Sequence, residues 1–238
     1  MEHPILSISG VTRRFGGVVA LKELSFDIHQ GEAVGLMGPN GAGKTTLLNV
    51  VTGEFRPDSG RIIFKGCNIT GLPCHQICRL GLVRTYQIPQ PFSDLTVMQN
   101  VIVAARFGRD MDQKAAAGKA DEVLEFVGLA DKKHLPARDL VTANLKLLEL
   151  ARILATKPEL ILLDEVAGGL TEAEIPRLID VLKKIHSSGI AFLLIEHVIN
   201  VMTETVDRIV VVSEGAKIAE GTPADIMKND RVIEVYLG

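Results

Sequence analysis

The stretch from Gly38 to Thr46, GPNGAGKTT, constrains this chain more than any other part of its sequence. It fits the phosphate-binding loop pattern Gly-x-x-x-x-Gly-Lys-Ser/Thr at every fixed position. The apolar run 33–37 before it predicts a short buried strand, and residues 44–51 after it predict the opening of a helix. A glycine-rich turn that matched by chance would lack this strand–loop–helix context. The sequence therefore predicts a loop that binds a nucleoside triphosphate.

The residue types in this loop suit the chemistry of phosphate binding. Glycines let the backbone take conformations closed to other residues, so that N–H groups turn inward and form a nest for an anion. The following helix directs the positive end of its dipole into the same hollow. Lys44 supplies a point charge for the terminal phosphates, and the Thr45 hydroxyl can ligate Mg²⁺. The predicted nucleotide-binding residues of the loop are Gly38, Pro39, Asn40, Gly41, Ala42, Gly43, Lys44, Thr45 and Thr46.

Length, composition and charge exclude several classes of protein. A chain of 238 residues, of which 47% are hydrophobic, suits one large domain or a core with a sub-domain. The net charge of −3 gives no support for a nucleic-acid-binding surface. No apolar run approaches the roughly 20 residues of a membrane-spanning helix. Residues 1–4 lack the basic and apolar regions of a signal peptide. We therefore expect a cytoplasmic chain that is soluble on its own.

The cysteines are Cys67, Cys74 and Cys78, with His75 among them. Their spacing matches no common zinc pattern, and no second Cys/His pair follows at a useful distance. We expect reduced thiols that are buried or half-buried rather than a metal cluster.

The remaining pattern predicts an α/β core interrupted by helices. Alternating residues at 6–11 and 24–28 predict an antiparallel sheet that leads into a parallel core. Two prolines in 88–92 end the strands and helices predicted before them. From Thr96 to about Ala155 the residue pattern predicts helices. The predicted further elements are strands at 61–64, 82–87 and 208–212 and helices at 73–80, 97–102, 114–127, 144–156 and 172–187. Residues 1–88 and 156–238 thus form the predicted core, and 89–155 form an inserted helical sub-domain.

Polar side chains follow two buried apolar runs. Residues 160–163 lead into Asp164 and Glu165, and residues 190–195 lead into Glu196 and His197. Ligands of open α/β sheets bind at the carboxyl ends of the strands. Asp164 is placed to hold Mg²⁺, Glu165 to orient or deprotonate a water, and His197 to hydrogen-bond a γ-phosphate. Each residue alone is compatible with a solvated strand end or helix start, but together with the intact loop they predict a hydrolytic site.

Two further residues are candidates with open alternatives. Gln87 ends the predicted strand 82–87 and can sense metal or water. Phe15 precedes a glycine turn, and its ring can pack against that turn or stack on a nucleobase. The local pattern alone does not decide between these roles.

The order of these motifs resembles the nucleotide-binding subunit of an ATP-binding cassette (ABC) transporter over essentially the whole chain. The resemblance implies one ABC ATPase domain over 1–238, with a RecA-like P-loop core, an N-terminal antiparallel sub-sheet and an inserted helical sub-domain. It implies hydrolysis of ATP to ADP and phosphate with Mg²⁺, coupled to transport. The implied roles are catalysis by Glu165, His197, Gln87 and Lys44, metal binding by Thr45, Gln87 and Asp164, and adenine stacking by Phe15.

Several short sequence segments resemble those of the ATPase subunits that serve branched-chain amino acid importers. They are Arg14-Phe15-Gly16-Gly17, Arg84-Thr85-Tyr86-Gln87, Leu150-Ala151-Arg152, Ile195-Glu196-His197 and Val235-Tyr236-Leu237-Gly238. The ATPases of amide or urea importers and the lipopolysaccharide-export ATPase share many of these segments. The resemblance implies transmembrane permease subunits, a second ATPase subunit that is a copy or a different chain, and indirectly a periplasmic or extracellular binding protein. The expected location is the cytoplasmic face of the inner membrane.

The chain departs from this family at the signature loop. The family sequence Leu-Ser-Gly-Gly-Gln should fall at 140–144, where this chain has LVTAN. In the family this loop closes over the γ-phosphate held by the opposite subunit. Thr142 can offer a substitute hydroxyl and Asn144 a side-chain amide, whereas Ala143 restricts the backbone. We hypothesise an asymmetric pair of ATPase subunits. The partner's ordinary signature loop would complete the ATP site of this chain, whereas the altered loop of this chain would complete the partner's ATP site poorly. Val166, where the family usually has proline, should matter little.

The region from Gln87 to Asn100 is the predicted docking surface for a membrane subunit, with Phe92 and Leu95 expected to be exposed. The alternative is a loop that only packs on the helical insert. Soluble ABC proteins that act on DNA or ribosomes need a coiled-coil insert or two cassettes, for which this chain has no room. The guanine-reading Asn-Lys-x-Asp motif of P-loop GTPases is also missing.

Overall fold

The computed structural model describes residues 3–237, without the side chains of residues 236 and 237. The predicted absence of a signal peptide at residues 1–4 and the family phrase at 235–238 therefore fall partly outside the described residues.

A small antiparallel sheet forms the first layer, with strand order β2-β1-β4-β5. Its strands are β1 (Leu6–Phe15), β2 (Val18–Ile28), β4 (Ser59–Phe64) and β5 (Cys67–Asn68). The strands β1 and β2 are longer than the sequence predicts. The register of their pairing shifts between Ile8 and Val11 around Gly10, whose φ is 61°. Such an irregularity interrupts the two-residue period, so the pattern in the sequence stops early.

A larger sheet carries the phosphate loop, with strand order β10-β9-β3-β8-β7-β6. Its strands are β3 (Ala33–Met37), β6 (Leu82–Arg84), β7 (Leu160–Asp164), β8 (Ala191–Ile195), β9 (Arg208–Ser213) and β10 (Ala216–Gly221). All neighbours are parallel except β9 and β10. Because β3, β8 and β7 are parallel neighbours, their carboxyl ends bring the phosphate loop, His197 and Glu165 to one edge.

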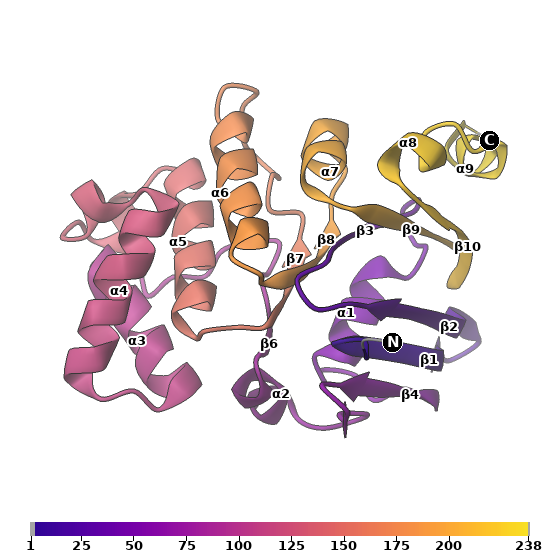
Figure 1. The fold of residues 1–238 in the computed structure, drawn as a ribbon, viewed down its shortest axis with the longest axis horizontal. Coiled ribbons are helices and arrows are strands. Elements are labelled where there is room, and N and C mark those ends of the chain that lie inside the picture. Colours follow the sequence, from indigo (N-terminus) through magenta and orange to yellow (C-terminus); the bar gives the residue numbers. More distant parts are fainter. Residues whose placement is uncertain (1–2, 238) are drawn as a thin grey trace.

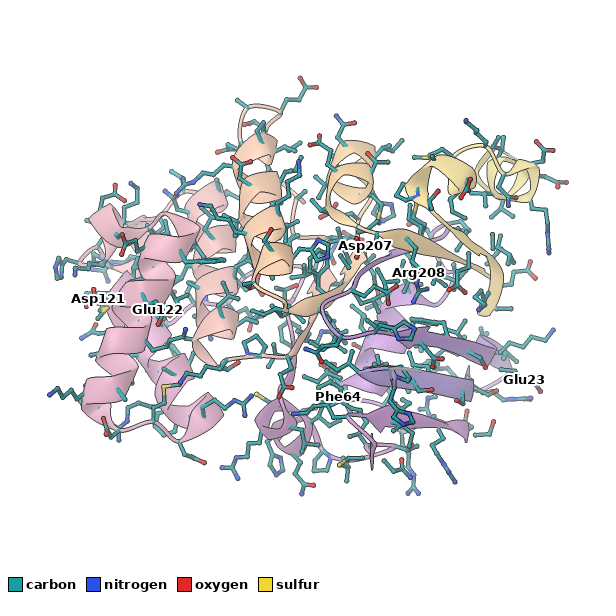
Figure 2. The ribbon with its side chains drawn as sticks, in the orientation of Figure 1. Glu23, Phe64, Asp121, Glu122, Asp207 and Arg208 are labelled. Atoms are coloured by element: carbon teal, nitrogen blue, oxygen red, sulfur yellow. The ribbon has the colours of Figure 1, made fainter. Side chains whose placement is uncertain are left out.

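The opposite end of β3 is tied to β9 by polar side chains. A carboxylate oxygen of Asp207 accepts a hydrogen bond from the backbone N–H of Ala33 at 2.8 Å, and Arg208 pairs with Glu32 at 2.7 Å. Figure 2 labels Asp207 and Arg208, which lie next to each other where β9 begins. These bonds fix where β3 begins and therefore where its phosphate loop emerges.

Helices cover the larger sheet. The helices of the core are α1 (Lys44–Val51), α2 (Cys74–Leu80), α6 (Ile175–Ser187), α7 (Ile199–Thr205), α8 (Pro223–Ile226) and α9 (Asp230–Leu237). The others are α3 (Val97–Arg109), α4 (Gln113–Val127), α5 (Thr142–Ala155) and two 3₁₀ turns, Ala130–Lys132 and Ala137–Asp139. The helices α3, α4 and α5 lie side by side at one end of the molecule, away from β1 and β2 (Figure 1). We propose that they form the helical sub-domain expected at 89–155.

Two hydrophobic clusters pack against opposite faces of the larger sheet. Leu160 and Leu162 of β7 join α1 and the antiparallel sheet, whereas Ile161 and Leu163 join α3 to α6. This two-sided burial explains why β7 is a continuous apolar run rather than an alternating one.

Local sequence signals explain the ends of several helices. Thr96 and Gln99 form a capping box at the start of α3, and Gly128 ends α4 with φ 76°. In contrast, α5 begins at Thr142, two residues before the predicted start at Asn144. The altered signature residues Thr142, Ala143 and Asn144 therefore lie in the first turn of a helix.

Candidate nucleotide-binding and hydrolysis site

The phosphate loop lies between β3 and α1, and its backbone requires glycine. The angle φ is 158° at Gly38, 80° at Gly41 and 99° at Gly43. A Cβ atom on Gly38 would lie 2.1 Å from the carbonyl oxygen of Val212, and one on Gly43 would lie 2.3 Å from that of Ala20. Gly43 is the N-cap of α1, where no side chain occupies the first N–H groups. These N–H groups are the ones that can bind a phosphate.

Lys44 lies under the loop. Its Nζ donates hydrogen bonds to the carbonyl oxygens of Gly38 at 2.6 Å and Pro39 at 3.0 Å. Burial lowers the pKa of Lys44, while the carboxylates of Glu165 and Asp164 act in the opposite direction. The ammonium is thus within electrostatic range of both acidic residues that the sequence predicts for the site.

The predicted catalytic side chains of Gln87 and His197 both contact Glu165. Gln87 Nε2 donates a hydrogen bond to Glu165 Oε2 at 2.7 Å, and His197 Nε2 lies 3.2 Å from Glu165 Oε1. The Glu165 side chain keeps 28% of its surface exposed, so water can reach it. The strand β6 ends at Arg84, so the prediction that Gln87 ends a strand is wrong. Gln87 reaches Glu165 from an irregular loop instead.

Asp164 is buried and paired with a residue that the sequence analysis did not include in the site. Its Oδ2 atom lies 3.1 Å from Nη2 of Arg84, and both side chains are only 6% exposed. Burial raises the pKa of Asp164, and the guanidinium of Arg84 counteracts this rise. Arg84 also donates to the Asn49 side chain of α1, which links β6, β7 and α1 at the site.

We expect replacement of Arg84 by methionine to destabilise the fold strongly. The variant leaves the buried Asp164 carboxylate unpaired, which typically costs about 3–5 kcal/mol. The loss should shrink as the pH falls, because protonation of Asp164 removes the unpaired charge. Urea denaturation at several pH values measures this.

The matched control for Arg84→Met is Lys183→Met. Lys183 pairs with Glu204 at 2.9 Å, but both side chains are about half exposed. Loss of this exposed ion pair should lower the free energy of unfolding by less than about 1 kcal/mol. Equal destabilisation by the two variants would contradict the importance of the buried pair.

The described side chains suit Mg²⁺ held partly by a nucleotide. No group of three or more His, Cys, Asp or Glu in residues 3–235 could hold a metal ion by itself. The oxygen donors that the sequence predicts are the Thr45 hydroxyl, the Asp164 carboxylate and the Gln87 amide. Mg²⁺ characteristically takes one or two protein oxygens and completes its shell with water and phosphate oxygens. The donor set therefore fits this ion.

Phe15 is 40% exposed and packs with two residues absent from the predicted site. The Arg13 guanidinium lies 4.7 Å from the ring centroid, and Phe55 meets the ring edge-on with centroids 5.3 Å apart. The ring is therefore held in place while part of it stays accessible, as stacking on a nucleobase requires.

The altered signature residues differ in their exposure. Thr142 is exposed in the first turn of α5, next to the N-cap residue Val141, which makes no capping hydrogen bond. Asn144 is buried, and its Oδ1 accepts a hydrogen bond from Arg177 Nη1 at 3.2 Å. Arg177 therefore engages the oxygen of this amide, and no hydrogen bond of its nitrogen is seen among the described residues, so a substitute role for the Asn144 amide stays a prediction.

Glu196 is a second buried carboxylate that the sequence analysis did not assign. Its Oε1 accepts a hydrogen bond from the backbone N–H of Ala167 at 2.6 Å, and its Oε2 accepts one from that of His197 at 3.2 Å. Burial raises its pKa, and these backbone donors oppose the rise. A charged residue directly after a fully apolar strand was the only sequence signal for it.

Two further features, the cysteines and the helix lengths, lie outside the site. Cys67 and Cys74 are exposed and only Cys78 is half-buried, so the expectation of buried thiols is wrong for the first two. Cys67 lies on the short edge strand β5 and Cys74 is the first residue of α2, and neither belongs to the two hydrophobic clusters. Within residues 3–237, no helix has the length and apolar content needed to cross a bilayer.

A parallel strand, a phosphate loop, a helix and a glutamate at the end of a nearby strand define a P-loop ATPase. Residues 21–168 match the family model described as ABC transporter. Residues 216–238 match the model described as branched-chain amino acid ATP-binding cassette transporter. The chain therefore belongs to the ABC transporter family.

Known proteins resemble the chain over its full length. It is 38% identical to the high-affinity branched-chain amino acid transport ATP-binding protein LivG of Escherichia coli K12, covering 100% of this chain and 99% of that protein. It is 37% identical to BraF of Pseudomonas aeruginosa, with the same coverage. The ADP conformation of MJ1267, an ATP-binding cassette of an ABC transporter, matches with a TM-score of 0.90 and 30% identity over 99% of each chain. The predicted fold class is confirmed. The chain is an ATP-binding, ATP-hydrolysing subunit of a membrane transporter.

Proposed function

We propose that this subunit powers an importer for branched-chain or other amino acids at the cytoplasmic face of the inner membrane. The observation that supports this is the similarity to LivG and BraF over the full length of the chain. The further partners are transmembrane permease subunits, a second ATPase subunit and, indirectly, a periplasmic or extracellular binding protein.

Each proposed site residue has a role in hydrolysis. The N–H groups of residues 38–46 and the ammonium of Lys44 bind the phosphates, and Phe15 stacks on the adenine. Thr45, Asp164 and Gln87 would hold Mg²⁺, which would supply charge neutralisation at the phosphates. Glu165 orients a water and accepts its proton.

Two neighbours support Glu165 in this role. Gln87 and His197 hold one carboxylate oxygen each, so the carboxylate has a defined orientation. His197 is also placed to stabilise charge on the γ-phosphate as its bond breaks.

The proposed function predicts which uptake process depends on this chain. Cells lacking it should lose uptake of labelled leucine, isoleucine or valine, and the wild-type chain should restore it. The Glu165→Gln variant, which retains the nucleotide loop, should not restore uptake. Unchanged uptake of all three amino acids in the deletion strain would contradict the proposed substrate class.

We also propose that the dimer is asymmetric. Thr142 is the exposed signature residue that offers a hydroxyl, whereas Val141 and Ala143 offer no side-chain donor. Losing one or two charge-assisted hydrogen bonds of about 1.5–3 kcal/mol each would slow hydrolysis in the partner's site. An ordinary signature on a different partner would still complete this chain's own site.

The asymmetry is tested by purifying the tagged chain from detergent-solubilised native membranes and identifying its partners by mass spectrometry. A second, different ATPase subunit with two membrane proteins is the expected result. Recovery of this ATPase alone with a permease pair would contradict asymmetry, as would hydrolysis by the isolated chain at the rate of the mixed complex.

The proposed docking surface for the permease lies beside a cavity of about 270 Å³ between α2 and α5. Tyr86, Ile88 and Phe92 are exposed along its loop, with 71% of Ile88 accessible. Leu95 is half-buried, so the expectation that it is exposed is wrong. It lies where residues 93–97 pair with 135–138, which covers part of its side chain.

We expect Asp94→Lys to weaken membrane association. Asp94 is exposed and pairs with Arg138 at 2.7 Å. Reversing its charge places a repulsive or unpaired group on the docking loop, whereas Arg138→Gln breaks the same ion pair without a reversal. Co-sedimentation with permease-containing membranes should fall for Asp94→Lys only. Retained association of Asp94→Lys would count against this surface.

A further inference from the structure

One face of α5 holds the loop that carries Gln87. Lys146 Nζ donates to the carbonyl oxygen of Gln87, Glu149 Oε1 accepts from the N–H of Tyr86, and Arg152 Nη1 donates to the carbonyl oxygen of Gln90, each at 2.8 Å. These residues are three positions apart, so they lie on one side of the helix. Residues 85–90 form no helix or strand. Side chains of α5 therefore supply hydrogen bonds that a sheet would otherwise provide.

Lys146 differs from the other two because it also contacts Glu165. Its Nζ lies 3.3 Å from the carbonyl oxygen of Glu165, and the residue is only 3% exposed. A buried ammonium must be satisfied by polar partners. Its partners here are the backbone carbonyls of Gln87 and Glu165, whose side chains bond to each other at 2.7 Å.

The backbone of Glu165 needs such support. Its φ is 48°, in the left-handed region that costs a non-glycine residue about 1–2 kcal/mol. Its N–H donates to the carbonyl oxygen of Ile195 at 2.9 Å, and its carbonyl oxygen accepts from the N–H of Gly168 at 3.1 Å. The Lys146 ammonium is the only side-chain donor to this carbonyl among the described residues. Strained residues of this kind persist where their surroundings determine them from several sides.

We propose that Lys146 is a positioning residue for hydrolysis, which orients Glu165 and Gln87 together by holding both carbonyl oxygens. Without the ammonium, the Glu165 carbonyl loses one of its donors and the Gln87 loop loses its attachment to the first turns of α5. The carboxylate then samples orientations that do not meet the attacking water. Nucleotide binding is unaffected, because Lys146 makes no hydrogen bond to residues 38–46 in the described structure.

Lys146→Met tests this in the transporter assembled with its membrane partners. We expect kcat for ATP hydrolysis to fall about 10–100-fold, as small misplacements of catalytic groups produce. The KM and the directly measured Kd for ATP should stay within about threefold of their wild-type values. This range is narrower than the tenfold change in affinity that 1.4 kcal/mol would cause. Lys146→Arg, which can still donate to two carbonyls, should restore most of kcat.

Arg109→Met is the matched control. Arg109 donates to the carbonyl oxygens of Thr156 and Lys157 at 2.7 Å each, at the far end of α5 and remote from Glu165. It should lower the thermal midpoint while kcat stays near wild type. The proposal is overturned if Lys146→Met keeps wild-type kcat, if its ATP affinity falls in parallel with kcat, or if Lys146→Arg fails to restore activity. Should the methionine variant not fold, Lys146→Gln replaces it under the same criteria.

Discussion

Glu165→Gln should lower the rate of ATP hydrolysis by about 10²–10⁴-fold, the usual contribution of a general base. The amide has nearly the same shape but accepts no proton from water. Nucleotide affinity should persist, because the phosphate loop lies on β3 and α1 rather than on β7. Steady-state hydrolysis together with direct ATP binding measures both quantities in one preparation.

Glu214→Gln is the control for Glu165→Gln. Both residues are glutamates in the left-handed region, with φ of 49° at Glu214 and 48° at Glu165. Glu214 lies in the turn between β9 and β10, so its replacement should leave hydrolysis unchanged. If Glu165→Gln kept more than a tenth of wild-type hydrolysis, a role as general base would be excluded.

Gly43→Ala should abolish nucleotide binding. The added Cβ atom would lie 2.3 Å from the Ala20 carbonyl oxygen, at a residue with φ of 99°. The left-handed conformation alone costs about 1–2 kcal/mol, and the steric overlap requires the backbone to move as well. The loop then loses the arrangement of N–H groups that binds phosphate.

Gly41→Ala separates the two causes. Gly41 lies in the same loop with φ of 80°, but an added Cβ atom would meet no atom within 4 Å. It should weaken ATP binding by about 1–2 kcal/mol, the conformational cost alone. Calorimetric titration of ATP into both variants makes the comparison. Equal losses of affinity would show that the contact with Ala20 is unimportant.

The parts of the fold that local chemistry determines were predictable from the sequence. The phosphate loop at 38–43 and the strand β7 are each determined by residues that are neighbours in the sequence. The predictions of this loop and of this strand therefore agree with the structure. The extent of β6 was not predictable, because Gln87 leaves the sheet where side chains of α5, some sixty residues later, hold its backbone. Strand propensity in residues 85–87 contains no information about that contact.

The site shows the same division between local and distant causes. Asp164 and Glu165 follow an apolar strand, and the sequence therefore indicates their position. Arg84 gives no comparable signal, since its partner is eighty residues away in the chain. The inward orientation of Asn144 likewise depends on Arg177. Polar side chains that contact each other across the fold are the part that pattern analysis misses.

The two backbone hydrogen bonds of Glu196 have a consequence for motion. One carboxylate holds both the segment after Glu165, through Ala167, and the segment that carries His197. Neither segment can shift alone without breaking a bond to a buried charge, which is costly. We therefore expect the two segments to travel as one unit. A subunit that presses on the residues after Ala167 would then move the segment that carries His197 along with them, so contact at one segment would be transmitted to the other.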